Sequence, residues 1–291
     1  MIESEVFEAA LSKAAAGNDP ALQAFGIERL TLVPQSVEER LVIEGSGRAS
    51  MSTDRSLADL GGYEIGEFRG ALDKKVVQEL ATLVLQMRLA KLGPFPASPG
   101  GVQVRISAVA GGASQQAVIG TADPAALEVV RPLLSKLDAI AGEVHKRPVA
   151  SLALTADFPA EGIKVGKVSL RIALVFRNGG SEGVYISHPA AASRCALVFG
   201  FKEDLPPDVT PLPMELQEAI LKPALRDPPP YLYVPAGNEA AVGFEATLLL
   251  EKPGKYLVRA SYTDASPGSA VAGRRKLRGA VFSADTAFKA S

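Results

Sequence analysis

The sequence predicts an α+β N-terminal domain, built as a sheet with helices on one face, followed by an all-β sandwich. Two stretches in the first half, residues 73–90 and 127–144, repeat apolar side chains at helical spacing. Beyond residue 160 the apolar period changes to two, and Gly or Pro turns separate short alternating segments. We therefore expect two domains, residues 1–159 and 160–291, each with its own core.

The chain is expected to start with a helix over residues 4–16, which ends at Gly17. Asp19 followed by Pro20 is typical of an N-cap with proline at the first helical position, and predicts a short helix to about residue 25. Alternating apolar residues then predict two extended stretches, 41–44 and 63–68.

The first long helix, residues 73–90, has Asp73 in position to cap it and Gly93-Pro94 to end it. Alternation on both sides of Gly111-Gly112 predicts a β-hairpin over residues 102–120.

A second long helix is predicted to begin at Asp123-Pro124. Pro132 falls inside its apolar stripe and should kink the helix or split off its first turns. A strand over residues 149–157 completes this domain, in which each helix buries one face against the sheet.

The second domain is predicted from alternating apolar residues and turns, without a strong helical stripe, a pattern typical of a β-sandwich. The expected strands include residues 168–176, 184–186, 195–201, 232–234, 242–250, 256–262 and a last one around residue 281.

Four segments of this half carry a family resemblance: Asn178 after Leu-Val-Phe-Arg, Tyr-Leu-Tyr-Val-Pro-Ala-Gly at 231–237, Lys-Pro-Gly-Lys-Tyr at 252–256, and Leu-Arg-Gly-Ala-Val-Phe-Ser at 277–283. They resemble the closing strands of bacterial immunoglobulin-like domains, in which a Pro-Gly-x-Tyr turn leads into the penultimate strand. The resemblance covers roughly residues 160–291 and implies an immunoglobulin-like β-sandwich. Such sandwiches host many unrelated functions.

The first half has a strand–strand–helix–hairpin–helix order. This order is similar to the emfourin group, small bacterial inhibitors of thermolysin-like metalloproteases, and the resemblance implies an inhibitory role. The glycine-rich motif near the start of that family has only Gly45-Ser46-Gly47 as its counterpart here.

Composition excludes several classes of function. Because 31 Lys+Arg and 32 Asp+Glu leave a net charge of −1, we expect no nucleic-acid binding, which needs clustered cations. No apolar run reaches about 18 residues, so no membrane span is predicted. The acidic start, Met-Ile-Glu-Ser-Glu, differs from a secretory signal and favours a cytoplasmic location. The single cysteine, Cys195, excludes an internal disulfide and a Cys-rich metal site.

Few side chains could support catalysis. The two histidines are His145, expected at the end of the second long helix, and His188, expected in a surface turn. A nucleophilic pair of Cys195 with His188 would need a reactive thiol, but Cys195 shares the alternating face of Leu197, which predicts a buried, inert thiol. The motifs of phosphate loops, dinucleotide sites and nucleophile elbows do not occur. We expect no catalytic residues, no cofactor and no metal.

Two segments are candidate partner-binding surfaces. Residues 203–230 hold eight of the 21 prolines and a predicted short helix, 214–221, with Met214, Leu216 and Leu221 as apolar anchors. An equal alternative for this segment is a proline-stiffened crossover that covers the open end of the sandwich. The second surface is a basic stretch that would meet an acidic partner or phosphate, or would be a solvated loop: Arg274, Arg275, Lys276 and Arg278.

The leading hypothesis is a non-enzymatic protein-interaction module, most concretely an inhibitor or immunity-type binding protein that has a protein partner. One alternative is a structural subunit of a larger assembly, favoured by the exposed edges of a sandwich. Another is a carboxylate-dependent hydrolase with its site on the N-terminal domain. A deep pocket with converging carboxylates would favour the enzyme.

Overall fold

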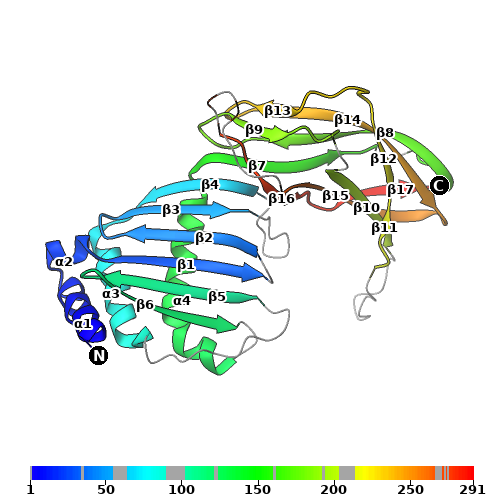
Figure 1. Ribbon diagram of the computed structural model, residues 1–291. Helices are drawn as coiled ribbons and strands as arrows, with labels where there is room; N and C mark the ends of the chain where they lie inside the picture. The colour runs from blue at the N-terminus through cyan, green and yellow to red at the C-terminus, as the bar shows by residue number, and fades with distance from the viewer. Residues whose placement is uncertain are drawn as a thin grey trace. The chain divides into compact units, whose positions relative to one another are not determined.

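The chain is mostly β and divides into two compact units (Figure 1). The computed structural model describes residues 2–33, 36–54, 64–89, 102–120, 124–159, 162–191, 194–202, 214–265, 271, 273 and 275–291. Unit 1 comprises Met1–Asp54 and Glu67–Val149, and unit 2 comprises Arg55–Gly66 and Ala150–Ser291.

Unit 1 contains the helices α1 (Ile2–Ala15), α2 (Asp19–Gln23), α3 (Lys74–Met87) and α4 (Pro124–His145). Its strands are β1 (Gly26–Val33), β2 (Ser36–Glu44), β3 (Arg48–Thr53), β5 (Gln103–Ala110) and β6 (Ala113–Gly120). Two further strands carry residues of both units, β4 (Glu64–Ala71) and β7 (Pro148–Asp157).

Unit 2 contains the remaining strands. They are β8 (Gly166–Arg177), β9 (Val184–Ser187), β10 (Cys195–Lys202), β11 (Gln217–Glu218), β12 (Ile220–Pro223), β13 (Tyr231–Val234), β14 (Glu239–Leu250), β15 (Gly254–Asp264), β16 (Gly279–Phe282) and β17 (Thr286–Ala290).

The strands form one large sheet and two smaller ones. The large sheet has ten antiparallel strands in the order β12-β14-β8-β7-β4-β3-β2-β1-β5-β6. A five-stranded sheet has the order β11-β10-β15-β16, with β17 paired to β15, and β13 pairs with β9. None of the helices that the structure describes is long and apolar enough to cross a membrane.

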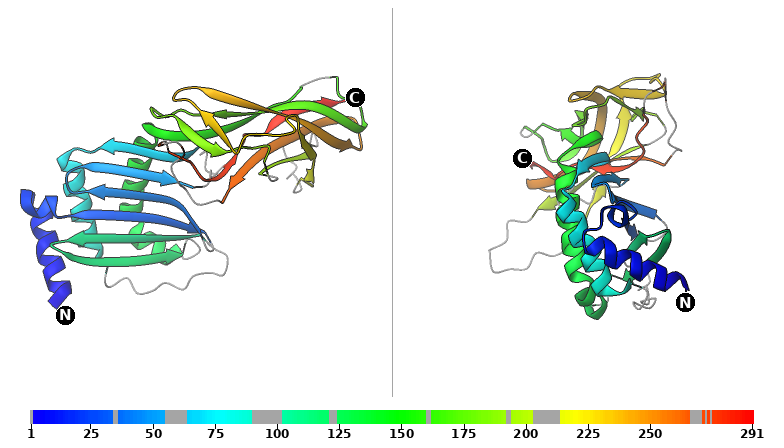
Figure 2. Two further views of the ribbon diagram at one scale, coloured as in Figure 1. Left: turned by 45° about the horizontal axis from the view of Figure 1, so that its top comes forward. Right: turned by 90° about the vertical axis from the view of Figure 1, so that its left-hand side faces the viewer.

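In unit 1 the two long helices lie on one face of the strands, as the sequence predicts (Figures 1 and 2). Leu80 of α3 and Leu137 of α4 belong to one hydrophobic cluster with Ile43 and Ile106 of the strands. The hairpin β5–β6 turns at Gly111-Gly112, where both glycines have positive φ, as predicted. Strands β1 and β3 were not predicted.

One detail of the predicted helices is wrong, and one of the two outcomes predicted for Pro132 does not occur. The N-cap of α2 is Asn18 rather than Asp19, because the Asn18 side chain accepts the backbone N–H of Ala21 at 3.1 Å. Helix α4 also includes Pro132 within its bounds, so its first turns are not split off. Pro132 is exposed, and the carbonyl group left without its helical N–H partner can bond to water instead.

A buried cation links the sheet of unit 1 to its longest helix. The guanidinium of Arg29 in β1 bonds both to Glu39 in β2 and to Asp138 in α4. Because two carboxylates balance the charge, Arg29 can occupy the helix-covered face of the sheet at 5% exposure.

In unit 2 the predicted alternation is confirmed, and two sheets contribute to one hydrophobic cluster. Phe176 of β8 and Phe244 of β14 come from the large sheet, whereas Phe199 of β10 and Val258 of β15 come from the five-stranded sheet. Strand β7 supplies Leu152, Leu154 and Ala156 to the same cluster.

Candidate functional site

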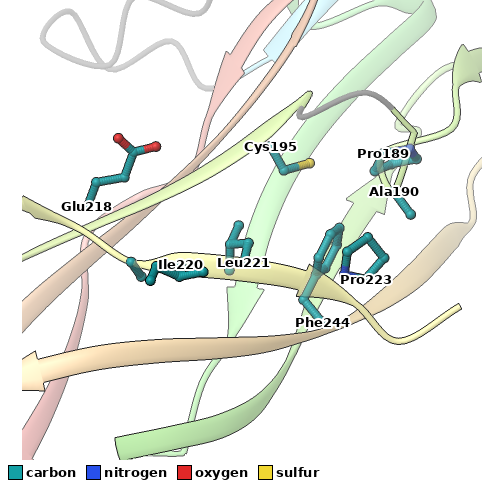
Figure 3. A pocket seen from close by; sticks show the side chains of 9 residues that line it. Pro189, Ala190, Cys195, Glu218, Ile220, Leu221, Pro223 and Phe244 are labelled. Carbon is teal, nitrogen blue, oxygen red and sulfur yellow. The ribbon is translucent and has the colours of Figure 1, made fainter. Parts of the chain in front are cut away.

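A groove of about 570 Å³ opens in unit 2 between β10 and β12 (Figure 3). Its volume is within the range typical of ligand pockets. Most of the lining residues have apolar side chains, but polar atoms, which include the Glu218 carboxylate, make up more of the exposed lining than apolar atoms do. The lining consists of Pro189, Ala190, Cys195, Glu218, Ala219, Ile220, Leu221, Pro223 and Phe244.

The groove exists because the chain changes sheets beside it. Strand β11 pairs with β10, and the backbone N–H of Ala219 donates to the carbonyl oxygen of Leu197 at 2.8 Å. From Ile220 the chain leaves β10 and pairs with β14 instead. Continuing the β10–β11 register would place Leu221 opposite Cys195, and in Figure 3 these two side chains belong to the two strands that border the groove.

The walls follow the two-residue period of the strands. Leu221 faces Ala246 across the β12–β14 pair and packs against the cluster of unit 2, and Phe244 is buried in that cluster. Ile220, one residue before Leu221, points to the opposite face of the sheet and is 61% exposed.

The segment that forms β11 and β12 corrects one prediction. Residues 214–216 have no regular structure, and β11 and β12 follow, so the helix predicted over 214–221 is wrong. Pairing with β10 and then with β14 outweighs the weak helical pattern. Met214 and Leu216 line a small pocket of about 60 Å³ with Val198 and Leu257. Residues 203–213 of the predicted surface lie outside the described residues.

Cys195 is half-buried in the wall of the groove, so the prediction of a buried side chain is wrong. It packs against the hydrophobic cluster, and desolvation raises the pKa of its thiol to about 12. The thiol is therefore protonated near neutral pH and behaves as a small apolar group.

His188 lies just before the groove residues Pro189 and Ala190, and it is only 5% exposed, so the predicted surface position is wrong. Its Nδ1 accepts the backbone N–H of Ala190 at 3.2 Å, which leaves the proton of the neutral ring on Nε2. Burial lowers the pKa of the ring because it disfavours the charged form.

The basic stretch is partly built into unit 2. The side chain of Lys276 is 4% exposed, and its Nζ lies 3.4 Å from Oδ2 of the buried Asp264. Arg275 accepts the backbone N–H of Tyr185 at 2.9 Å through its carbonyl oxygen. Arg278 is exposed, and Arg274 lies outside the described residues. Lys276 thus balances an internal carboxylate.

Asp264 is the centre of this charge cluster. Its Oδ1 accepts a hydrogen bond from Arg194 at 2.8 Å, so two cations contact one fully buried carboxylate. The hydroxyl of Tyr262, 3.5 Å from Oδ2, donates to the carbonyl oxygen of Ser187 at 2.9 Å. The cluster joins β15 to the strand β9 and to the basic stretch.

Unit 1 contains a second, open pocket, lined by residues of β2, β3 and β4. It encloses about 810 Å³ and combines the arginines Arg40, Arg48 and Arg69 with the carboxylates Glu44 and Glu67. In the described part of the chain, no three His, Cys, Asp or Glu residues form a group that could hold a metal ion.

Sequence reasoning missed most of the groove lining. Phe244 was predicted as a strand residue on the alternating apolar face, but nothing in the sequence pattern indicated that a groove lies beside it. The two short strands β11 and β12 had no recognisable signal, since they are only two and four residues long.

No family model matches the sequence, and no curated protein matches it. Among solved structures, about half of the chain is similar to part of a β-glucosidase from Erythrobacter marinus, with 15% identity and a TM-score of 0.22 over 48% of this chain. The match spans only 16% of that enzyme. A β-glucosidase from Kluyveromyces marxianus matches 48% of this chain with 11% identity, a TM-score of 0.20 and 15% of its own length.

A further solved structure is AvmM, described as catalysing macrocyclization in alchivemycin A biosynthesis. It matches 47% of this chain and 88% of its own length, with 14% identity and a TM-score of 0.26.

Proposed function

We propose that the chain is a non-enzymatic protein-interaction module, most concretely an inhibitor or immunity-type binding protein. We propose further that a protein partner docks on the edge of unit 2 formed by β12 and the groove. The observation that carries this proposal is the exposure of two large apolar side chains there, Ile220 at 61% and Leu249 at 54%.

These two side chains form one surface. Ile220 pairs with Thr247 of β14, and Leu249 lies two residues further along β14 on the same face. They are therefore diagonal neighbours across the strand pair, on the outward face beside the apolar groove. Exposed apolar side chains grouped with an apolar groove are typical of a protein-binding surface.

The proposed folds are an α+β domain for unit 1 and an immunoglobulin-like sandwich for unit 2. Support for the sandwich comes from the regular elements of the described residues of unit 2, which are all strands, and from the cluster that β8 and β14 share with β10 and β15. The proposal of a binding role also fits the chemistry of the groove. A protonated Cys195 thiol and a His188 ring engaged with Ala190 are poorly suited to nucleophilic catalysis.

Site-specific photo-crosslinking tests the proposed function. A photoreactive residue replaces Leu249 in one variant and Val129 in the control, because Val129 is equally exposed on α4 at 53%. In extract of the native organism, position 249 should yield a crosslinked protein that position 129 does not. Adding Ile220→Glu to the first variant should abolish that product, while circular dichroism stays unchanged. Equal products from both positions, or a product insensitive to Ile220→Glu, would contradict the proposed surface.

A second candidate function, a structural subunit, is favoured by the position of β12 at the end of the ten-strand order. Such an edge can pair with another chain. Sedimentation of the pure protein distinguishes the two functions: a monomer supports the binding protein, and a concentration-dependent assembly that is lost in the Ile220→Glu variant supports the subunit.

A further inference from the structure

We infer that the groove takes an extended peptide strand, apolar along its length and with a cation at one end, which pairs through its backbone with Leu221 of β12. This inference rests on the proposed function and specifies the partner chemistry of the same site.

The register of β12 determines which of its backbone groups face the groove. The backbone N–H of Ala224 donates to the carbonyl oxygen of Gly243 at 3.0 Å, next to the paired residues Pro223 and Phe244. In an antiparallel pair the residues that bond to the partner alternate. Lys222 and Ile220 therefore also bond toward β14, whereas the N–H and C=O of Leu221 and the C=O of Pro223 point to the other side.

Strand β10 presents a matching edge. The backbone N–H of Thr263 donates to the carbonyl oxygen of Arg194 at 2.8 Å, so Arg194 and Ala196 bond toward β15. The backbone of Cys195 and Leu197 then points away from β15, as the bond from Ala219 to the Leu197 carbonyl confirms. Within the described residues, the sheet order ends at β12, and β11 has left β10 before it reaches Cys195.

An extended strand is the ligand whose chemistry matches both borders. It supplies alternating N–H and C=O groups to a strand edge, and its side chains enter pockets on alternate positions. Pro223 has no N–H, so the pairing with β12 is limited to the groups of Leu221 and the Pro223 carbonyl. A short segment fits this edge better than a long one.

The lining residues indicate which types of side chain the bound strand should carry. Leu221, Phe244 and Cys195 offer apolar contacts inside the groove, whereas Glu218 is the one carboxylate in the lining. Its carboxylate is exposed and points away from Leu221 and Phe244 in Figure 3. A lysine or arginine at one end of the strand would meet this carboxylate at the rim, while the rest of the segment stays apolar.

The test is a titration of the full-length protein with blocked peptides about six residues long, in which valine and alanine alternate beside the one charged residue. One peptide carries lysine at the N-terminal end, a second carries it at the C-terminal end, and matched peptides carry glutamate. In ¹⁵N spectra we expect one lysine peptide to shift the amide signals of Leu221 and Cys195. N-methylation of alternate residues of that peptide should weaken binding roughly tenfold or more, because it removes backbone donors.

Charge reversal at the rim tests the second half of the inference. Glu218→Lys should exchange the preference, so that the glutamate peptide binds better than the lysine peptide. The control Glu251→Lys reverses another exposed carboxylate, which lies just after β14 outside the groove lining, and should leave the preference unchanged.

Three results would overturn the inference: no peptide binds, the N-methylated peptide binds as well as its parent, or Glu218→Lys has no effect on the preference. If crosslinking from position 249 still captures a partner, the proposed function survives and only the strand chemistry fails. Peptide binding without any crosslinked partner would support the groove as a strand site and contradict the proposed docking surface around Leu249.

Discussion

Ala219 donates its backbone N–H to the carbonyl oxygen of Leu197 at 2.8 Å, and at the next residue the chain begins to pair with the other sheet of unit 2. Ala219 is 6% exposed, so this crossing point is inside the hydrophobic cluster. This hydrogen bond determines where the groove begins. Beyond it the two strands separate, so that Leu221 and Cys195 lie on opposite borders of the groove.

Removing this hydrogen bond should destabilise unit 2. Ala219→Pro eliminates the N–H and leaves the Leu197 carbonyl unpaired, with an expected loss of about 2 kcal/mol in the free energy of unfolding. Ala219→Gly keeps the donor and should cost only about 1 kcal/mol. Urea unfolding of both variants measures the difference, and equal losses would show that the bond is not what holds the crossing in place.

Asp264→Asn should be one of the most destabilising changes of a single charged residue. Arg194 and Lys276 would keep their charges around a neutral side chain, and breaking a buried ion pair in this way costs about 3 kcal/mol or more. The control is Asp285→Asn, whose partner Arg259 is well exposed, with an expected loss below about 1 kcal/mol. Thermal unfolding of both variants compares the two costs; a smaller loss at Asp264 than at Asp285 would contradict a buried cluster.

His188 should make the protein less stable as the pH falls. Its pKa in the folded chain is below the ordinary value of 6.5, so the unfolded chain takes up the proton first. The stabilisation is complete above pH 6.5 and is lost as the pH falls from there toward the folded-state pKa. Urea unfolding at pH 7.5 and pH 5 should show a larger drop for the wild type than for His188→Gln. Identical drops would mean that the ring is solvated.

Cys195 should react slowly with thiol reagents although it borders a groove. A pKa of about 12 leaves roughly a thousandfold less thiolate than a thiol with a pKa near 9. Alkylation by iodoacetamide at pH 7.5 should be at least a hundredfold slower in the folded protein than in urea. Cys195→Ala should cost about 1–2 kcal/mol, as a small change beside the core. Rapid labelling of the folded protein would contradict the desolvated environment.

Two fragments of different length test whether the hydrophobic cluster of unit 2 needs strand β7 to fold. Residues 160–291 lack β7, which supplies the buried Leu152 and Leu154 and pairs with β8. We expect residues 148–291 to give better dispersed amide NMR signals than residues 160–291. Equal dispersion from the two fragments would show that β7 is dispensable for this core.

Periodicity predicted the two long helices and the longest strands well. The helix around Leu80 and the strands around Phe176 and Phe244 each bury one face. A buried face requires apolar residues at the spacing of the helix or strand, and this spacing is visible in the sequence. Short elements failed for the same reason. The four residues of β12 have no period of their own, and their hydrogen bonds to β14 determine their conformation.

By itself, the sequence determined the two kinds of pattern, the change between them, and the scarcity of catalytic side chains, since each depends on residue types and local spacing. Only the tertiary structure decided that Lys276 faces a buried carboxylate, that His188 is buried, and that Cys195 lies opposite Leu221 across a groove. These outcomes depend on pairing between residues far apart in the chain. Local spacing does not indicate which strand a segment will pair with. The groove therefore could not be predicted from the sequence alone.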